Sequence, residues 1–329
     1  MSVKRSQVAI VGPQQAQLLE TDFDDAPAAA DELVGRTVVS LISAGTEISG
    51  YYVASKTYPR FPGYAAVFEV EQAGPEAGDV RPGELVLCMG PHASRQRCRR
   101  ADASPLPAGL APEKAACARM AAVSMTTLAT TAARPPDLVM VTGLGPVGNL
   151  AAQVFQACGY RVLGVEPIAQ RRETAQACGI GYVAERAPRK DEPDFAKVAL
   201  AVECSGHEKA VLDACACVRK GGEVVLVGVP WERKTDLYAF DLLHRVFHKY
   251  VVLRSGWEWE LPTQPADFRP HSILGNIRAA MDWLAQGRLR VDGLLELRRP
   301  SEAQACYQDL LHRRTSRLIT LFDWCADTA

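Results

Sequence analysis

The stretch that decides the fold runs from Asp137 to Gly148 and reads DLVMVTGLGPVG. Leu138 to Val141 form an unbroken apolar run, which is typical of a strand buried on both faces of a sheet. The turn after it has the pattern G-x-G-x-x-G and opens an apolar helical segment that ends at Gly159. Strand, glycine turn and helix in this order predict a βα unit that binds the pyrophosphate of a dinucleotide.

Each residue of the turn has an expected task. Gly143 permits the tight turn, and Gly145 removes the side chain that would block the pyrophosphate. Gly148 lets the helix pack closely on the sheet. Pro146 and Val147 begin the helix, whose free N–H groups and positive dipole end attract phosphate.

The next strand-like run, residues 161–165, ends at an acidic residue. Glu166 lies 18 residues after Gly148, where a carboxylate can accept both hydroxyl groups of the adenosine ribose. Its charge would repel a 2′-phosphate, which favours NAD over NADP as the cofactor. Arg171 and Arg172 follow closely and soften that preference, unless they belong to a solvated helix face.

The same alternation continues along the chain. Expected strands lie at 137–142, 161–165, 198–202 and 222–227, and expected helices at 149–158, 169–178 and 208–218. Near-continuous apolar strands separated by helices predict an α/β fold with a doubly wound parallel sheet.

The N-terminal part is instead rich in short β-like runs, at 37–42, 65–70 and 84–88, with turns at 74–78 and 81–84. We therefore expect three segments: a β-rich domain of barrel type at 1–125, a nucleotide-binding domain at 126–265, and a return to the first domain at 266–329. The last segment should contain helices at 277–286 and 301–311 and a closing strand at 317–322.

Composition excludes several classes of partner. The 329 residues carry a formal charge of −1, which gives no reason to expect nucleic acid. No apolar run approaches the length of a membrane span, and the start of the chain does not resemble a secretory signal. We expect a cytoplasmic protein whose partner is a small-molecule substrate. The ten scattered cysteines indicate reduced thiols.

Five segments together resemble the medium-chain dehydrogenase/reductase superfamily, over essentially the whole chain. They are SAGTE at 43–47, PGYA at 62–65, MTTLA at 125–129, ECSG at 203–206 and GGEVVLVG at 221–228. The resemblance implies a Rossmann NAD-binding domain and a GroES-like catalytic domain. It also implies a homodimer, because many relatives are joined edge to edge through their nucleotide-binding sheets.

The chain departs from the zinc-dependent members at the metal ligands. Ala44 stands where the resemblance places a cysteine ligand, Tyr64 where it places a histidine, and Ala122 at the third ligand. Ala65 replaces the glutamate next to that histidine. Alanine has no lone pair, and zinc needs about three protein ligands. We therefore expect no catalytic zinc.

Without zinc, another group must handle the proton of the substrate. Tyr64 and Tyr51 are the leading candidates for the proton donor, although each can instead be a wall of the pocket. Thr46 matches the family's hydroxyl that touches the substrate alcohol. Glu47 follows it and can alternatively be an ion-pair partner of an arginine in the nucleotide-binding domain.

Other residues are candidates for the pocket and for the nicotinamide end. Tyr52 and His92 are further pocket candidates, with a structural role as the alternative for the histidine. By resemblance, the nicotinamide neighbours and later cofactor-side residues are Thr126, Cys204, Ser205, Gly228, Val229, Ser255 and Gly256. Trp257 and Trp259 could form a flat wall against a ring-shaped substrate, or fill an interface between domains.

Three functions are consistent with these features. The first is interconversion of a secondary alcohol and a ketone on a sugar, cyclitol or ring-bearing natural product, with NAD(H) and without zinc. The second is reduction of an activated C=C bond, as in zinc-free quinone and enoyl reductases, which often prefer NADPH. The third is dinucleotide binding without turnover.

Overall fold

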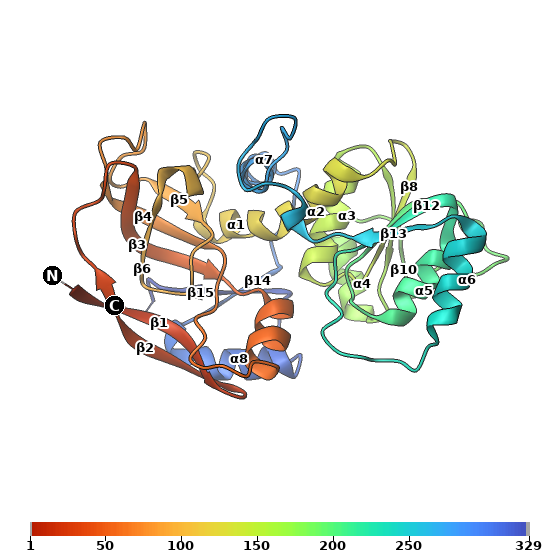
Figure 1. The fold of residues 1–329 in the computed structure, drawn as a ribbon, viewed down its shortest axis with the longest axis horizontal. Helices are drawn as coiled ribbons and strands as arrows, with labels where there is room; N and C mark the ends of the chain where they lie inside the picture. The colour runs from red at the N-terminus through yellow and green to blue at the C-terminus, as the bar shows by residue number, and fades with distance from the viewer. Residues whose placement is uncertain (1, 327–329) are drawn as a thin grey trace. The chain divides into compact units, whose positions relative to one another are not determined.

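The computed structural model describes residues 2–326 and divides the chain into two units (Figure 1). The first unit comprises residues 1–118 and 291–329, and the second comprises residues 119–290. The boundaries expected from the sequence were 125/126 and 265/266. The first boundary lies earlier because Arg119 pairs with Glu258 of the second unit. The second lies later because the segment after the sheet stays with that unit: the amide of Arg290 donates to Gln153 Oε1 (2.6 Å), and the Arg290 carbonyl accepts from Gln153 Nε2 (3.0 Å).

The second unit contains a six-stranded parallel sheet in the order β10-β9-β8-β11-β12-β13. The order reverses between β8 and β11, which is the point where doubly wound sheets bind ligands. The strands are β8 (Leu138–Thr142), β9 (Arg161–Val165), β10 (Val183–Ala184), β11 (Val198–Glu203), β12 (Val218–Leu226) and β13 (Val252–Ser255). The helices are α2 (Ala118–Thr130), α3 (Pro146–Ala157), α4 (Ala169–Ala177), α5 (Glu208–Cys217), α6 (Ala239–Lys249), η3 (Glu258–Glu260) and α7 (Ile273–Ala285).

Both faces of this sheet are buried, which explains the unbroken apolar strands. Val139 and Val141 of β8 point into one core, together with Phe155 of α3. Met140 points to the opposite core, which also contains Cys215 of α5. A strand covered on both faces needs apolar side chains at successive positions, so the doubly wound sheet predicted from the sequence is confirmed.

The first unit is β-rich. Its seven-stranded sheet has the order β14-β15-β3-β4-β5-β7, and β6 pairs with β3. These strands are β3 (Glu32–Leu41), β4 (Ala66–Ala73), β5 (Leu85–Cys88), β6 (Arg95–Arg99), β7 (Ala103–Pro105), β14 (Leu295–Arg298) and β15 (Ile319–Asp323). A hairpin of β1 (Ser2–Gly12) and β2 (Gln15–Asp24) forms a separate two-stranded sheet. The helical elements are η1 (Gly45–Val53), η2 (Arg100–Asp102), α1 (Pro112–Ala116), η4 (Pro300–Glu302) and α8 (Ala303–Leu311).

Two regions differ from the sequence expectation. No element was expected at residues 45–53, which form the π-helix η1, whose buried residues are Glu47, Ile48 and Tyr52. No element was expected between 228 and 276, yet this region contains α6, the edge strand β13 and η3. Leu242 and Val246 of α6 pack against the core of the sheet, whereas Phe240, Leu243 and Phe247 are exposed.

The ten cysteines are free thiols. Among residues 2–326, no helix combines the length and the apolar character that crossing a membrane requires.

Candidate functional site

The glycine turn after β8 is shaped by close approaches of the backbone. Gly143 has a φ of +79°, and a Cβ there would lie 2.9 Å from the amide nitrogen of Ser205. A Cβ on Gly148 would lie 1.8 Å from the carbonyl oxygen of Gly143. A Cβ on Gly145 would instead meet only Arg171 Nη1, at 3.9 Å. The first and third glycines are therefore required by packing, whereas the second leaves open space in front of the turn.

That open space lies at the N-terminus of α3. Gly145 is the N-cap, and Pro146 occupies the first turn. Since glycine has no side chain with which to cap the helix, the first amides and the positive end of the helix dipole remain available to an anion. This arrangement fits a pyrophosphate.

Glu166 follows β9 and lies beneath the turn. Its Oε2 accepts from the amide of Leu144 (2.9 Å), and its Oε1 accepts from the amide of Ile168 (3.0 Å). The side chain is 3% exposed, and Arg171 Nη1 lies 3.8 Å from Oε2. Glu166, which is expected to favour NAD, and Arg171, which is expected to soften that preference, thus form an ion pair. Arg172 donates to the carbonyl oxygens of Glu166 (2.8 Å) and Pro167 (2.7 Å).

Glu203 organises the loop after β11, and the sequence analysis had given it no task. Its fully buried carboxylate accepts from the amides of Ser205 (2.7 Å) and Gly206 (3.0 Å) and from Thr142 Oγ1 (3.3 Å). Burial raises the pKa of this carboxyl group. It also raises the pKa of the neighbouring Cys204 thiol, which therefore stays neutral. The sequence signal that could have identified Glu203 was an acidic residue at the end of an apolar strand.

The loops after β12 and β13 lie, like the glycine turn, at the carboxyl ends of the strands. The amide of Gly228 donates to the Glu203 carbonyl (2.7 Å), and a Cβ on Gly228 would lie 2.4 Å from the amide nitrogen of Gly206. The amide of Gly256 donates to the Leu226 carbonyl (2.8 Å). Val229 and Ser255, at the ends of these strands, are exposed. The structure thus gathers these predicted cofactor-side residues along the carboxyl ends of the strands.

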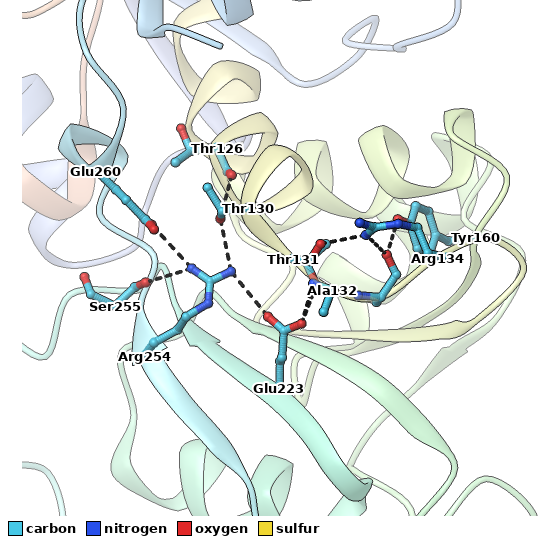
Figure 2. A network of polar contacts seen from close by, with 11 residues as sticks. Thr126, Thr130, Thr131, Ala132, Arg134, Tyr160, Glu223, Arg254, Ser255 and Glu260 are labelled. Atoms are coloured by element: carbon cyan, nitrogen blue, oxygen red, sulfur yellow. Dashed lines mark hydrogen bonds and ion pairs between the residues drawn. The ribbon is translucent and has the colours of Figure 1, made fainter. Parts of the chain in front are cut away.

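Figure 2 shows a polar network that joins α2 to β12 and β13. Glu223 Oε1 accepts from Thr131 Oγ1 (3.0 Å) and from the amide of Ala132 (2.6 Å). Arg254 Nη2 lies 3.4 Å from Glu223 Oε2 and donates to Thr130 Oγ1 (3.0 Å). Local sequence patterns do not indicate this network, because its members come from three separate segments of the chain.

The tyrosine and threonine candidates lie in the first unit. Thr46 and Tyr51 are half-buried on η1, and the Arg60 guanidinium lies 5.9 Å from the centroid of the Tyr51 ring. Tyr64 is half-buried just before β4. These three side chains remain candidates for substrate contact.

Glu47, His92 and Tyr52 have another role than the expected one. The Glu47 carboxylate accepts from the amide of Ser43 (2.8 Å) and from Tyr307 Oη (2.5 Å), and it lies 3.1 Å from His92 Nε2. His92 is fully buried, and its Nδ1 pairs with Ser40 Oγ (2.8 Å). Burial and the adjacent Glu47 raise the pKa of Tyr307. With its lone pairs engaged, Glu47 holds η1 in place and is not free to move a substrate proton.

Tyr52 is also fully buried, so the expectation that it lines a pocket is corrected. Its ring centroid lies 5.2 Å from that of Tyr307, and its hydroxyl accepts from Gln308 Nε2 (2.8 Å). The same correction applies to His92, for which the structural alternative holds. Glu47 pairs with a histidine of its own unit, not with an arginine of the nucleotide-binding unit.

The donor set for zinc does not fit this chain. Ala44 and Ala122 supply no lone pair, and Tyr64 stands in the remaining position. Within residues 2–326, no three His, Cys, Asp or Glu side chains are grouped as metal ligands would be.

The doubly wound sheet and its glycine turn place the chain in the class of dinucleotide-binding α/β proteins. Residues 146–260 match the family described as zinc-binding dehydrogenase. A 2-desacetyl-2-hydroxyethyl bacteriochlorophyllide A dehydrogenase from Rhodobacter capsulatus is 31% identical over 275 residues, which is 76% of each chain. A sorbitol dehydrogenase from Halalkalibacterium halodurans is 29% identical over 52% of this chain and 50% of its own.

A crystal structure of a zinc-binding dehydrogenase from Sinorhizobium meliloti, bound to NADP, shares the fold. Its TM-score is 0.77 at 18% identity, covering 98% of this chain and 99% of that chain. The chain belongs to the medium-chain dehydrogenase/reductase superfamily and is an oxidoreductase.

Proposed function

We propose that this protein interconverts a secondary alcohol and a ketone, using a pyridine dinucleotide and no zinc. The observation that carries the proposal is a glycine turn suited to a pyrophosphate in a chain whose metal-ligand positions hold Ala44, Tyr64 and Ala122. When bound, the dinucleotide accepts the hydride from the carbinol carbon or returns it to the carbonyl carbon. The chain must then supply or remove one proton at the oxygen.

Tyr64 and Tyr51 are the proposed proton donors. A phenol can give its proton to the carbonyl oxygen during reduction and take the hydroxyl proton during oxidation. Thr46 is proposed to donate a hydrogen bond to the same oxygen. Tyr51 and Tyr64 are each half-buried, so neither side chain is sealed in the core as those of Tyr52 and Tyr307 are.

NAD is the proposed cofactor because Glu166 carries a charge where a 2′-phosphate would lie. The substrate class is proposed from the relatives, one named for a hydroxyethyl bacteriochlorophyllide and another for sorbitol. A sugar, a cyclitol or a ring-bearing natural product with a secondary alcohol fits both names.

One observation favours a second candidate. The Arg171 guanidinium lies 3.8 Å from Glu166 and would be available to a 2′-phosphate. NADPH use would in turn favour reduction of an activated C=C bond. Turnover of enones with NADPH and none of polyols with NAD would select this alternative.

The test begins with calorimetric titration of the protein with NADH and NADPH, and with elemental analysis for zinc. Hydride transfer is then measured in single turnovers against cyclic polyols and ring-bearing secondary alcohols. Binding without transfer to any substrate would indicate a dinucleotide-binding protein without turnover. The absence of heat with either nucleotide would refute the proposal, and one tightly held zinc per chain would refute its zinc-free part.

The proton donor is tested by Tyr64→Phe and Tyr51→Phe. Loss of a general acid is expected to slow single-turnover hydride transfer by about a hundredfold or more, while nucleotide affinity stays unchanged. Tyr58→Phe, on the same segment, serves as the control and should transfer hydride at the normal rate. If both test variants keep the full rate, neither tyrosine is the acid.

A further inference from the structure

In the segment that follows β13, the exposed indoles of Trp257 and Trp259 flank the buried carboxylate of Glu258. Trp257 and Trp259 are 67% and 51% exposed, whereas Glu258 is 7% exposed. Glu258–Glu260 forms the short helix η3. Such a short turn has little packing of its own, so its conformation must come from contacts with other elements.

The first anchor is a buried ion pair. Arg119 Nη2 donates to Glu258 Oε1 (2.6 Å), and Nη1 donates to Oε2 of the same carboxylate. Arg119 is 1% exposed, so both charges are taken out of water. Burying two charges is costly unless the geometry is good, and here the contact is bidentate. The pair joins the first turn of α2 to a turn 139 residues later in the chain.

The second anchor is Arg254, the residue before Ser255. Its Nη1 lies 3.3 Å from Glu260 Oε2 and 3.4 Å from the Ser255 carbonyl oxygen. Its Nη2 donates to Thr130 Oγ1 at the end of α2 (Figure 2). One guanidinium therefore ties the end of the turn to the last residue of α2.

The two anchors act on one face of α2. Arg119, Thr126 and Thr130 are separated by seven and four residues, which places them along a single face of an α-helix. Thr126 lies between the anchors and is fully buried. Among residues 2–326 its hydroxyl oxygen has no hydrogen-bond partner. A buried hydroxyl without a hydrogen-bond partner costs free energy. A bound ligand that accepts this hydrogen bond would remove the cost.

We propose that the Arg119–Glu258 pair, together with Arg254, is a clamp that positions the nicotinamide end of the dinucleotide site. The clamp holds Thr126 and the Ser255–Gly256 backbone at a set separation, so that a ligand meets a preformed site. Arg119 and Glu258 are positioning residues and do not touch the reacting atoms. The inference rests on the proposed function, since it concerns the same dinucleotide.

The clamp makes different demands on the two halves of the cofactor. ADP-ribose contains the adenosine and pyrophosphate parts that the glycine turn and Glu166 are proposed to bind, but it lacks the nicotinamide. Loosening the clamp should therefore weaken the binding of NADH and leave the binding of ADP-ribose nearly unchanged. A general loss of structure would weaken both ligands together.

The experiment measures both dissociation constants by calorimetry for the wild type, Glu258→Gln, and the double variant Arg119→Met with Glu258→Gln. The single variant removes the carboxylate that balances the charge of a buried arginine, which endangers folding, whereas the double variant removes both charges. We expect the NADH dissociation constant to rise about tenfold in the double variant and that of ADP-ribose to change by less than about twofold. The time-resolved anisotropy of tryptophan emission should fall, because Trp257 and Trp259 gain freedom.

Asp137→Asn provides the matched control. Asp137 makes a two-point contact with Arg219 (3.0 and 3.2 Å) in the same unit, but it precedes β8 and so lies at the amino ends of the strands, away from the glycine turn at their carboxyl ends. Breaking that pair should leave both dissociation constants unchanged. Equal changes for NADH and ADP-ribose in the double variant, or no change in either, would overturn the clamp. A wild type that binds neither ligand would instead overturn the proposed function and the clamp with it.

Discussion

Cofactor choice is decided at the scale of single residues. Glu166 carries the charge that disfavours a 2′-phosphate, and Arg171 lies 3.8 Å away with the opposite charge. Glu166 also accepts the amide hydrogen of Leu144, so it has a structural task beside its electrostatic one. A useful substitution must remove the charge and retain the acceptor.

Glu166→Gln removes the charge and keeps one acceptor, because its amide oxygen can still accept from Leu144, while the hydrogen bond from the Ile168 amide is lost. The ratio of NADPH to NADH affinity should rise about tenfold, since the repulsion of the 2′-phosphate is removed. Arg171→Gln should shift the ratio in the opposite direction. The measurement is calorimetric titration of both nucleotides. A ratio that neither variant changes would mean that these two residues do not select the cofactor.

The buried Glu47–His92–Tyr307 network illustrates the limit of motif reading at this scale. Glu47 was selected because of its place in the SAGTE stretch, which carries no information about burial. In the structure its partners come from a loop 45 residues later and from a helix 260 residues later. Only the tertiary fold brings these side chains together.

At the scale of the element, the turn from β8 to α3 contains one glycine that the fold requires and another that dinucleotide binding is expected to require. A Cβ at Gly145 would enter open space, whereas a Cβ at Gly148 would collide with the Gly143 carbonyl oxygen. The two positions hold the same residue and lie three residues apart, but glycine is needed at each for a different physical reason.

Gly145→Ala should fold with an unchanged melting temperature and bind dinucleotide at least about tenfold more weakly, because the new methyl group occupies the place of the pyrophosphate. Gly148→Ala should lose about 2 kcal/mol or more of unfolding free energy, because the turn must move. Thermal unfolding and calorimetry give both readouts. If Gly145→Ala bound NADH at full strength, the phosphate would have to lie elsewhere.

At the scale of the whole molecule, one apolar surface is left uncovered in the single chain. Tyr238, Phe240, Leu243, Phe247 and Tyr250 lie on or next to α6 and are between 64% and 80% exposed. The neighbouring β13 is the edge of the parallel sheet and leaves backbone groups unpaired on one side. A second copy of the chain can cover both features by pairing the two edges around a two-fold axis.

We therefore expect a homodimer, with a light-scattering mass close to twice 35.7 kDa. Leu243→Asp combined with Phe247→Asp should give the single-chain mass, because charges on a buried apolar surface oppose association. Tyr182→Ser is the control, since Tyr182 is 47% exposed beside the opposite edge strand, β10. A wild type with the single-chain mass would contradict the expectation.

The sequence by itself determined the doubly wound sheet, the glycine turn and the acidic residue after β9. These features depend on local patterns: continuous apolar strands, glycines at set spacing, and a carboxylate at a strand end. The edge strand β13, the outward apolar face of α6, the Arg119–Glu258 clamp and the burial of Glu47 were decided only by the tertiary structure. The edge strand and the clamp depend on contacts between residues far apart in the chain. The exposure of α6 and the burial of Glu47 depend on what the rest of the fold places around each side chain.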